Sequence, residues 1–260
     1  MVSVGLLLLM QVSLTFAQGK PQVLKWNINN ESREALVYIP ATAKTQNTPV
    51  IFAFHGHGGT MRYTYIARGF ENLWPEAIFI CAQGLNTIGL LTDQEGKKTG
   101  WSMATENNRD LAFFDAMLAT LKKDYQIDDR RIYATGHSNG GGFTYLLWAK
   151  RAQIFAAFAP TATTAGRLTR ELKTPKPALH LMGLNDPLVK PFMQKATYNW
   201  VLKLNDCSVE GIKMDSNTTL YSGKNDNDVV LYIHNGGHEY PRSANQTIIS
   251  FFKNHSNNTP

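Results

Sequence analysis

The sequence predicts an α/β fold in which helices cover both faces of a mainly parallel central sheet. Short apolar segments typical of strands alternate along the chain with segments whose apolar residues recur at helical spacing. This alternation favours parallel strands joined by crossover helices. The 260 residues, of which 43% are hydrophobic and 18% charged, are enough for one sizeable core and have the composition of a globular protein.

The strands are expected, in chain order, at residues 22–28, 35–39, 49–54, 77–82, 131–135, 154–160, 177–182 and 229–233. The longest helix is expected over residues 108–125, where apolar side chains recur every three to four positions. Acidic residues near its start and Lys122-Lys123 near its end suit the helix dipole. Further helices are expected directly after the strand at 131–135, over residues 191–204, and over residues 244–252.

The N-terminus predicts a signal peptide over residues 1–17, with residues 18–260 forming a single domain. Residues 4–16 are almost entirely apolar, and Thr15 and Ala17 stand three and one residues before the expected cleavage point. Because this segment contains no Lys or Arg, a buried N-terminal helix is the alternative. Further along the chain, no apolar run approaches the ~20 residues that span a bilayer. The mature protein is therefore expected to be secreted or periplasmic, without a membrane span.

Charge and cysteine content narrow the possible functions. The formal net charge is +6, but the basic residues are scattered without an aromatic-basic stripe, so no nucleic-acid partner is expected. The charge is expected to give a soluble surface of one sign, with a positive field that favours acidic polymer substrates as the alternative. Cys81 and Cys207 allow one disulfide, with free buried thiols as the alternative. Neither lies in a CxxC motif, so no metal site is expected.

A candidate nucleophile lies in the segment Gly136-His137-Ser138-Asn139-Gly140, which matches G-x-S-x-G. An expected strand precedes the segment directly and an expected helix follows it, which is the context of the nucleophile elbow. Such a turn holds the serine in a strained conformation and needs small residues on either side. Ser138 is therefore expected at the carboxyl edge of the sheet, although a glycine-rich turn with an incidental serine is the alternative.

Several segments together resemble one enzyme family. They are residues 35–40, 54–59, 83–85, 101, 110–114, 131–141, 183–186 and 236–241. Through them the chain resembles the secreted esterases of carbohydrate esterase family one, grouped with poly(3-hydroxybutyrate) depolymerases and feruloyl or acetylxylan esterases. His57 and Tyr240 depart from that family, which more often has Cys and Trp at these positions. The resemblance implies an α/β-hydrolase catalytic domain over residues 18–260, an ester substrate and no cofactor.

The acid and base of a triad follow from chain order. A serine hydroxyl needs a base, the base needs an acid, and in this fold the order is Ser, Asp or Glu, then His. Asp186 follows an expected strand through a turn and is the expected acid, with Asp206 and Asp215 as rivals. His238 lies in a glycine-rich loop after the last expected strand and is the expected base, with His234 as the rival.

The remaining site residues surround the nucleophile. The oxyanion hole requires two N–H donors. One is expected from the backbone of Asn139, and the resemblance implies that the backbone of His57 supplies the other. His55 is expected to hold its loop by hydrogen bonding. Trp101 lines the substrate cleft in the family, but a place in the core is an equal alternative. Segment 87–100 contains glycines and is mostly polar in its second half, so it is expected to form a mobile rim or lid near this cleft.

These residues predict a secreted serine esterase that acts through an acyl-enzyme. Feruloyl or acetyl esters of plant polysaccharide are the first expectation, and a polymeric or oligomeric hydroxyalkanoate polyester is the alternative. A peptidase of this fold usually carries a further propeller or cap domain, which makes it the weaker rival. A binding module without catalysis is the remaining alternative, because fold alone does not establish activity.

Overall fold

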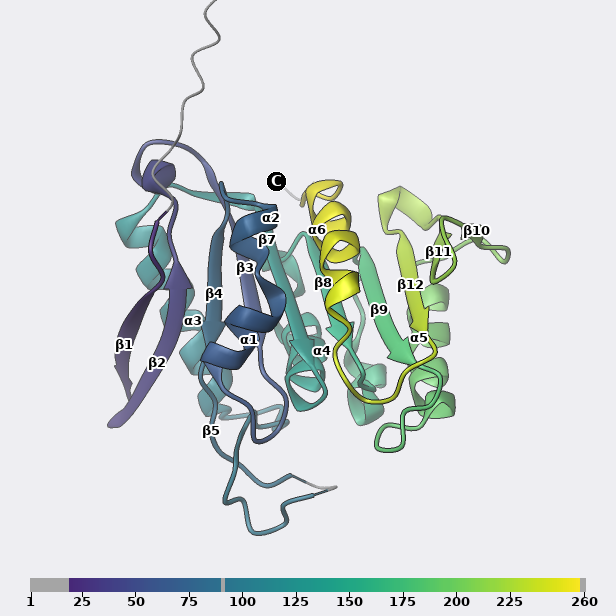
Figure 1. Ribbon diagram of the computed structural model, residues 1–260, viewed down its shortest axis with the longest axis horizontal. Helices are drawn as coiled ribbons and strands as arrows, with labels where there is room; N and C mark the ends of the chain where they lie inside the picture. The colour runs from purple at the N-terminus through teal and green to yellow at the C-terminus, as the bar shows by residue number, and fades with distance from the viewer. Residues whose placement is uncertain (1–18, 90–91, 258–260) are drawn as a thin grey trace, which may run out of the picture.

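The computed structural model describes residues 19–89 and 92–257, and the expected signal peptide lies outside them. A ten-stranded sheet runs through the described part in the order β1-β2-β4-β3-β7-β8-β9-β12-β11-β10 (Figure 1). Its strands are β1 (Gln22–Ile28), β2 (Glu31–Tyr38), β3 (Thr48–Phe54), β4 (Ile78–Ala82), β7 (Ile127–His137), β8 (Ala157–Thr161), β9 (Ala178–Gly183), β10 (Ile212–Lys213), β11 (Thr218–Tyr221) and β12 (Val229–His234). A separate small hairpin pairs β5 (Leu85–Asn86) with β6 (Thr99–Gly100).

The middle of the sheet is parallel and its two edges are antiparallel. All neighbouring strands from β4 through β3, β7, β8 and β9 to β12 pair in parallel. The edges are antiparallel additions: β1 and β2 at one side, β11 and β10 at the other. The turn between β1 and β2 has Asn29 and Asn30 at φ 52° and 66°, as a tight hairpin turn requires. The predicted mainly parallel sheet is therefore confirmed.

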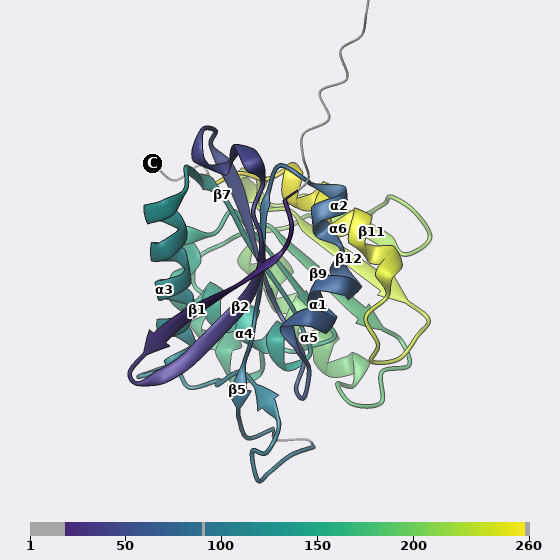
Figure 2. The same cartoon turned by 60° about the vertical axis from the view of Figure 1, so that its left-hand side comes forward.

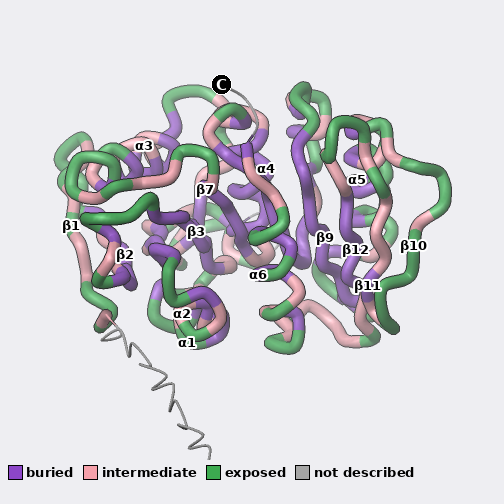
Figure 3. Tube along the Cα trace, turned by 90° about the horizontal axis from the view of Figure 1, so that it is seen from above, coloured by how far each residue is buried: buried purple, intermediate pink, exposed green. Residues whose placement is uncertain are grey.

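Helices cover both faces of the sheet. Three of them, α1 (Met61–Arg68), α2 (Phe70–Leu73) and α6 (Asn245–Lys253), lie on the face turned to the viewer in Figure 1. The other face carries α3 (Arg109–Asp124), α4 (Asn139–Arg151) and α5 (Pro191–Leu204). Figures 2 and 3 show the resulting three layers, with the buried residues concentrated along the sheet between them.

The alternation of side chains along β3 divides the core between these two layers. Phe52 and Phe54 belong to the apolar cluster under α3, α4 and α5, whereas Ile51 and Ala53 belong to the cluster under α1, α2 and α6. Successive residues of a strand point to opposite faces, so a strand covered on both faces must be apolar throughout. This is why the central strands were recognisable as continuous apolar runs.

The structure bears on the expectations for the two cysteines and for membrane-spanning helices. Both cysteines are free thiols, Cys81 buried in β4 and Cys207 half-buried, so the disulfide is absent and the alternative holds. Burial raises the pKa of the Cys81 thiol well above its usual value. Within residues 19–89 and 92–257, no helix has the length and apolar character needed to cross a membrane.

Candidate active site

The turn between β7 and α4 holds Ser138 in a strained backbone conformation. Ser138 has φ 55° and ψ −117°, a region that residues with a side chain rarely adopt. The turn is tight enough to require glycine on both sides: a Cβ on Gly136 would lie 2.1 Å from the carbonyl oxygen of Gly140. A Cβ on Gly140 would lie 2.4 Å from the carbonyl oxygen of Phe54 in β3. The glycines therefore permit the strain that lifts the serine above the sheet edge.

His238 links Ser138 to Asp186 by two short hydrogen bonds. Its Nε2 lies 2.8 Å from Ser138 Oγ, and its Nδ1 lies 2.8 Å from Asp186 Oδ2. An ionised carboxylate can only accept, so Nδ1 carries the proton and Nε2 accepts the hydrogen of the serine hydroxyl. The structure thus brings the three residues predicted from chain order into the geometry of a nucleophile, a base and an orienting acid.

Asp186 is held rigidly although it follows a loop. Only 2% of the residue is exposed, and its Oδ1 accepts the backbone N–H groups of Leu188 and Val189, each at 2.9 Å. Its Oδ2 accepts an N–H from the Gln194 side chain at 3.1 Å, besides the bond with His238. These donors compensate a buried negative charge and fix the direction of the carboxylate. Gln194 stands in the first turn of α5 and was not among the residues expected at the site.

The rival acids and base have other roles. Asp215 Oδ1 accepts the backbone N–H groups of Asn217 and Thr218 in a turn between β10 and β11. Asp206 occupies a turn with φ 51° after α5. His234 Nδ1 accepts the N–H of Gly236 and has no bond to Ser138 in the described structure. The geometry therefore assigns the interacting positions to Asp186 and His238.

The two expected oxyanion donors border the same cavity as the serine. The cavity, hereafter the cleft, measures about 1250 Å³ and is lined by Ser138, His238, His57, Asn139 and Trp101 among others. The loop after β3 passes directly beside the nucleophile, since a Cβ on Gly56 would lie 3.5 Å from Ser138 Cβ. A second cavity of about 990 Å³ lies at the amino ends of β8 and β9 and contains none of these residues.

Trp101 borders the cleft, but its ring belongs to the core. The residue is 1% exposed, and its indole N–H donates to the carbonyl oxygen of His55 at 2.9 Å. Its ring stacks on Phe143 and meets Phe54 edge-on. This burial corresponds to the core alternative and leaves little ring area for stacking on a substrate.

His55 holds the loop after β3, as expected. The buried ring pairs its Nδ1 with the carbonyl oxygen of Gly56 at 2.7 Å, while its Nε2 accepts the N–H of Gly84 at 2.9 Å. Desolvation lowers the pKa of His55 to about 4, so the imidazole is neutral at pH 7. A neutral ring can donate at one nitrogen and accept at the other. The two bonds together fix the position of the loop where it leaves β3.

A second, half-buried imidazole lies next to His238. The ring centroids of His137 and His238 are 5.1 Å apart, and His137 Nδ1 lies 3.2 Å from Thr161 Oγ1. Desolvation, followed by the neighbouring His238 and the buried Arg68, lowers the pKa of His137 to about 3. Arg68 stacks on Tyr240 with 3.6 Å from its guanidinium carbon to the ring centroid. His137 therefore packs against the base without adding a competing charge.

Three desolvated, neutral histidines predict that the fold loses stability in acid. Desolvation lowers the pKa of His55 to about 4, of His137 to about 3 and of His180 to about 4. The unfolded chain takes up these protons near pH 6.5, so it binds more protons than the folded chain between about pH 6.5 and 4. The free energy of unfolding should therefore fall as pH falls through this window, by up to about 1.4 kcal/mol per pH unit for each histidine.

Urea unfolding at pH 7 and at pH 4.5 measures this effect, and His180→Gln isolates one contribution. His180 is bonded to the hydroxyl of Tyr145 at 2.8 Å and is not among the residues that line the cleft. A glutamine keeps a polar partner for Tyr145 but does not titrate. The variant should lose less stability between the two pH values than the wild type. Equal losses in both proteins would contradict the assignment of a depressed pKa to His180.

The chain is similar in sequence to one hydrolase family and to several curated esterases. The sequence profile of the prolyl oligopeptidase family matches residues 103–234. A probable feruloyl esterase C of Aspergillus terreus is 26% identical over 252 residues, covering 92% of this chain and 88% of that protein. A bifunctional acetylxylan esterase/xylanase of Neocallimastix patriciarum is 27% identical over 157 residues, but the match covers 60% of this chain and 22% of that longer protein.

The fold is likewise shared with solved esterases. An acetyl xylan esterase from Aspergillus awamori superposes with a TM-score of 0.69 and 15% identity, over 89% of this chain and 99% of the other. At this identity the likeness concerns the fold alone, and it confirms the predicted α/β-hydrolase architecture.

Proposed function

The chain belongs to the prolyl oligopeptidase family, and from this premise we propose that it is a secreted serine esterase acting on feruloyl or acetyl esters of plant polysaccharide. The observation that carries the proposal is the hydrogen-bonded chain from Ser138 through His238 to Asp186, with 2.8 Å at each step. Relatives named as feruloyl and acetylxylan esterases support the substrate class. The apolar N-terminal segment supports secretion.

The proposed reaction uses the groups that face Ser138. His238 Nε2 takes the proton of Ser138 as its Oγ attacks the ester carbonyl, and Asp186 stabilises the resulting imidazolium. The amides of His57 and Asn139 bind the tetrahedral oxyanion. The alcohol then leaves with the proton from Nε2, and a water attacks the acyl-enzyme by the same sequence of transfers. Acyl transfer of this kind proceeds with side chains and backbone amides alone.

The lining of the cleft favours an acidic polymer among such esters. Among residues 19–89 and 92–257, the side chains with a full charge that line it are all cations: Lys98, Arg109 and Arg167. Arg167 is exposed and donates to the carbonyl oxygen of Met103, so its charge is not neutralised by that contact. A polysaccharide that carries uronic acid carboxylates near its ester groups would complement this charge.

A peptidase activity is the second candidate, because the family is named for oligopeptide hydrolysis. The same triad can cleave esters and amides, since both reactions pass through a tetrahedral oxyanion. A hydroxyalkanoate polyester remains the further alternative within ester hydrolysis. These candidates differ in the substrate and share the nucleophile, so one panel distinguishes them.

The test is hydrolysis by wild-type and Ser138→Ala protein of a panel of esters and one amide. The panel contains p-nitrophenyl acetate and butyrate, methyl ferulate, acetylated xylan with and without uronic acid, a hydroxybutyrate oligomer and an acyl-amino acid p-nitroanilide. The wild type should cleave the esters, with the lowest KM for the xylan that carries uronic acid. Ser138→Ala should lose at least about 10⁴-fold in kcat on every substrate.

Two outcomes would contradict the proposal. Cleavage of the amide but of none of the esters would establish the peptidase candidate instead. No cleavage by a folded wild-type protein would place the chain among the binding modules. A preference for the hydroxybutyrate oligomer would retain the mechanism and replace the substrate class.

A further inference from the structure

Both expected oxyanion donors carry side chains that bind one short segment beside the cleft. The side chain of Asn139 accepts the backbone N–H of Trp101 at 2.7 Å and donates to the carbonyl oxygen of Trp101 at 3.1 Å. The ring of His57 bonds through Nε2 to Asp93 Oδ2 at 3.0 Å. Asp93 lies in the hairpin that β5 and β6 close, and Trp101 follows β6 directly. His57 and Asn139, which are 82 positions apart in the sequence, thus bond to the same stretch of chain between Asp93 and Trp101.

The hairpin is shaped around the His57 ring. A Cβ on Gly89 would lie 2.7 Å from Nε2 of the ring, and a Cβ on Gly100 would lie 2.7 Å from Nδ1. Neither position has room for a side chain while the ring is in place. The side chains of His57 and Asp93 are 11% and 8% exposed. The imidazole is therefore enclosed on both sides by the hairpin rather than lying free in the cleft.

Asp93 is itself fixed within the hairpin. Its Oδ1 accepts the backbone N–H of Lys97 at 3.2 Å, and its Oδ2 accepts that of Lys98 at 2.8 Å. Its backbone exchanges two hydrogen bonds with Gly89, both at 2.9 Å. A carboxylate with these donors has a defined direction, so the bond to Nε2 determines where the His57 ring lies.

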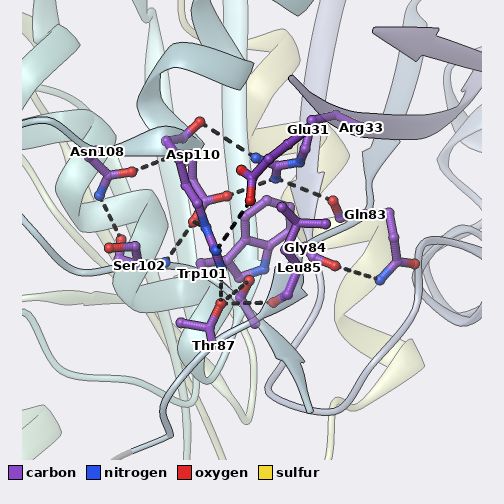
Figure 4. Close-up of polar contacts among 12 residues, drawn as sticks. Glu31, Arg33, Gln83, Gly84, Leu85, Thr87, Trp101, Ser102, Asn108 and Asp110 are labelled. Atoms are coloured by element: carbon purple, nitrogen blue, oxygen red, sulfur yellow. Dashed lines mark hydrogen bonds and ion pairs between the residues drawn. The ribbon is translucent and has the colours of Figure 1, made fainter. Parts of the chain in front are cut away.

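Residues 99–102 also bond to the loop after β3, which carries His57, and to the core. The N–H of Gly58 donates to the carbonyl oxygen of Thr99 at 2.7 Å, and Thr99 Oγ1 donates to that of Gly59 at 2.8 Å. On the other side, the N–H of Ser102 donates to Asp110 Oδ2 at 2.7 Å. Asp110 is paired with Arg33 at 2.7 Å, and the two side chains are 0% and 1% exposed (Figure 4).

We propose that Asp93 together with residues 99–102 forms a frame that sets the position of the two oxyanion donors. His57 and Asn139 are its positioning residues, each acting through its side chain on its own backbone N–H. The inference rests on the proposed function, because it concerns the oxyanion of that reaction. An oxyanion hole works only when its donors stand 2.7–3.1 Å from the developing charge, so a small displacement is costly. The frame opposes this displacement because it bonds to the side chains of both donor residues.

The first test compares Asp93→Ala and Asp93→Asn with Glu95→Ala. Glu95 lies on the same hairpin, but it is exposed, and within the described residues its ion pair is with the exposed Lys97. With p-nitrophenyl acetate as substrate, Asp93→Ala should lower kcat about tenfold or more, with KM within about twofold. Asp93→Asn should recover most of the rate, because its side-chain oxygen still accepts N–H groups. Glu95→Ala should match the wild type in kcat, KM and melting temperature.

The second test adds Asn139→Ala and the double variant with Asp93→Ala. If both side chains act through one frame, their effects on kcat should be less than multiplicative, which a double-mutant cycle measures. The inference is overturned if Asp93→Ala and Asn139→Ala change KM or the melting temperature while kcat stays within about twofold of wild type. It is also overturned if Asp93→Asn is as slow as Asp93→Ala. An inactive wild type would instead refute the proposed function.

Discussion

An Asp186→Asn variant should fold normally and hydrolyse esters about 10⁴-fold more slowly than the wild type. In the wild type, Oδ1 of Asp186 accepts two backbone N–H groups, and Oδ2 accepts the Nδ1–H of His238 and an N–H of the Gln194 side chain. The two backbone donors cannot turn away, whereas the Gln194 amide can turn its oxygen toward a new donor, so the asparagine oxygen stays at the Oδ1 position and its NH₂ group takes the place of Oδ2. That group donates to Nδ1, which moves the ring proton to Nε2. Nε2 then faces Ser138 with a hydrogen and cannot accept its proton.

The measurement is kcat on p-nitrophenyl acetate, together with the melting temperature. Asp215→Asn is the matched control, since this carboxylate also caps a turn with two backbone N–H groups but lies outside the site. The control should keep wild-type kcat. If Asp186→Asn retained more than about a tenth of the rate, Asp186 would not be the group that orients His238.

A Gly140→Ala variant should be destabilised by about 3 kcal/mol and lose its esterase activity. The added Cβ would lie 2.4 Å from the carbonyl oxygen of Phe54 and 2.5 Å from that of His55, both in backbone that the sheet holds in place. The strand and helix at the nucleophile turn would have to separate, which moves Ser138 away from His238. For a domain of this size the destabilisation corresponds to about 10 °C in melting temperature.

Gly142→Ala, two residues further along α4, is the matched control for stability. Its Cβ would lie 3.2 Å from Sδ of Met103, an atom near the end of a flexible side chain that can move. Because alanine favours a helix interior over glycine by about 1 kcal/mol, the melting temperature should stay level or rise slightly. Equal destabilisation by the two substitutions would contradict the account of Gly140, because helix composition rather than the turn would then be limiting.

The central strands and the nucleophile turn were predictable because their physical requirements are local in sequence. A strand covered on both faces must be apolar along the covered length, and β4 and residues 49–54 of β3 satisfy this. The turn at Ser138 needs glycine at fixed offsets. Asp186 and His238 could be singled out because each follows an apolar strand at the same sheet edge, in the order this fold requires.

Other elements escaped prediction because their signals are weak or lie between distant segments. The edge strands β10 and β11 are short, and their residues are mostly exposed or half-buried. Helix α1 is capped by the Thr60 side chain at one end and by Gly69 with φ 52° at the other, signals that could have revealed it. The pairing of His57 with Asp93 and the role of Gln194 depend on tertiary contacts and have no local pattern.

The central claim is that Ser138 is a nucleophile activated by His238. Labelling with a fluorophosphonate tests it most directly, because the reagent reacts with an activated serine and the product can be located by mass spectrometry. We expect one phosphonyl group per chain, on the peptide that contains Ser138, with no label in Ser138→Ala and much slower labelling in His238→Ala. Labelling of a different residue, or none in a folded wild-type protein, would contradict it.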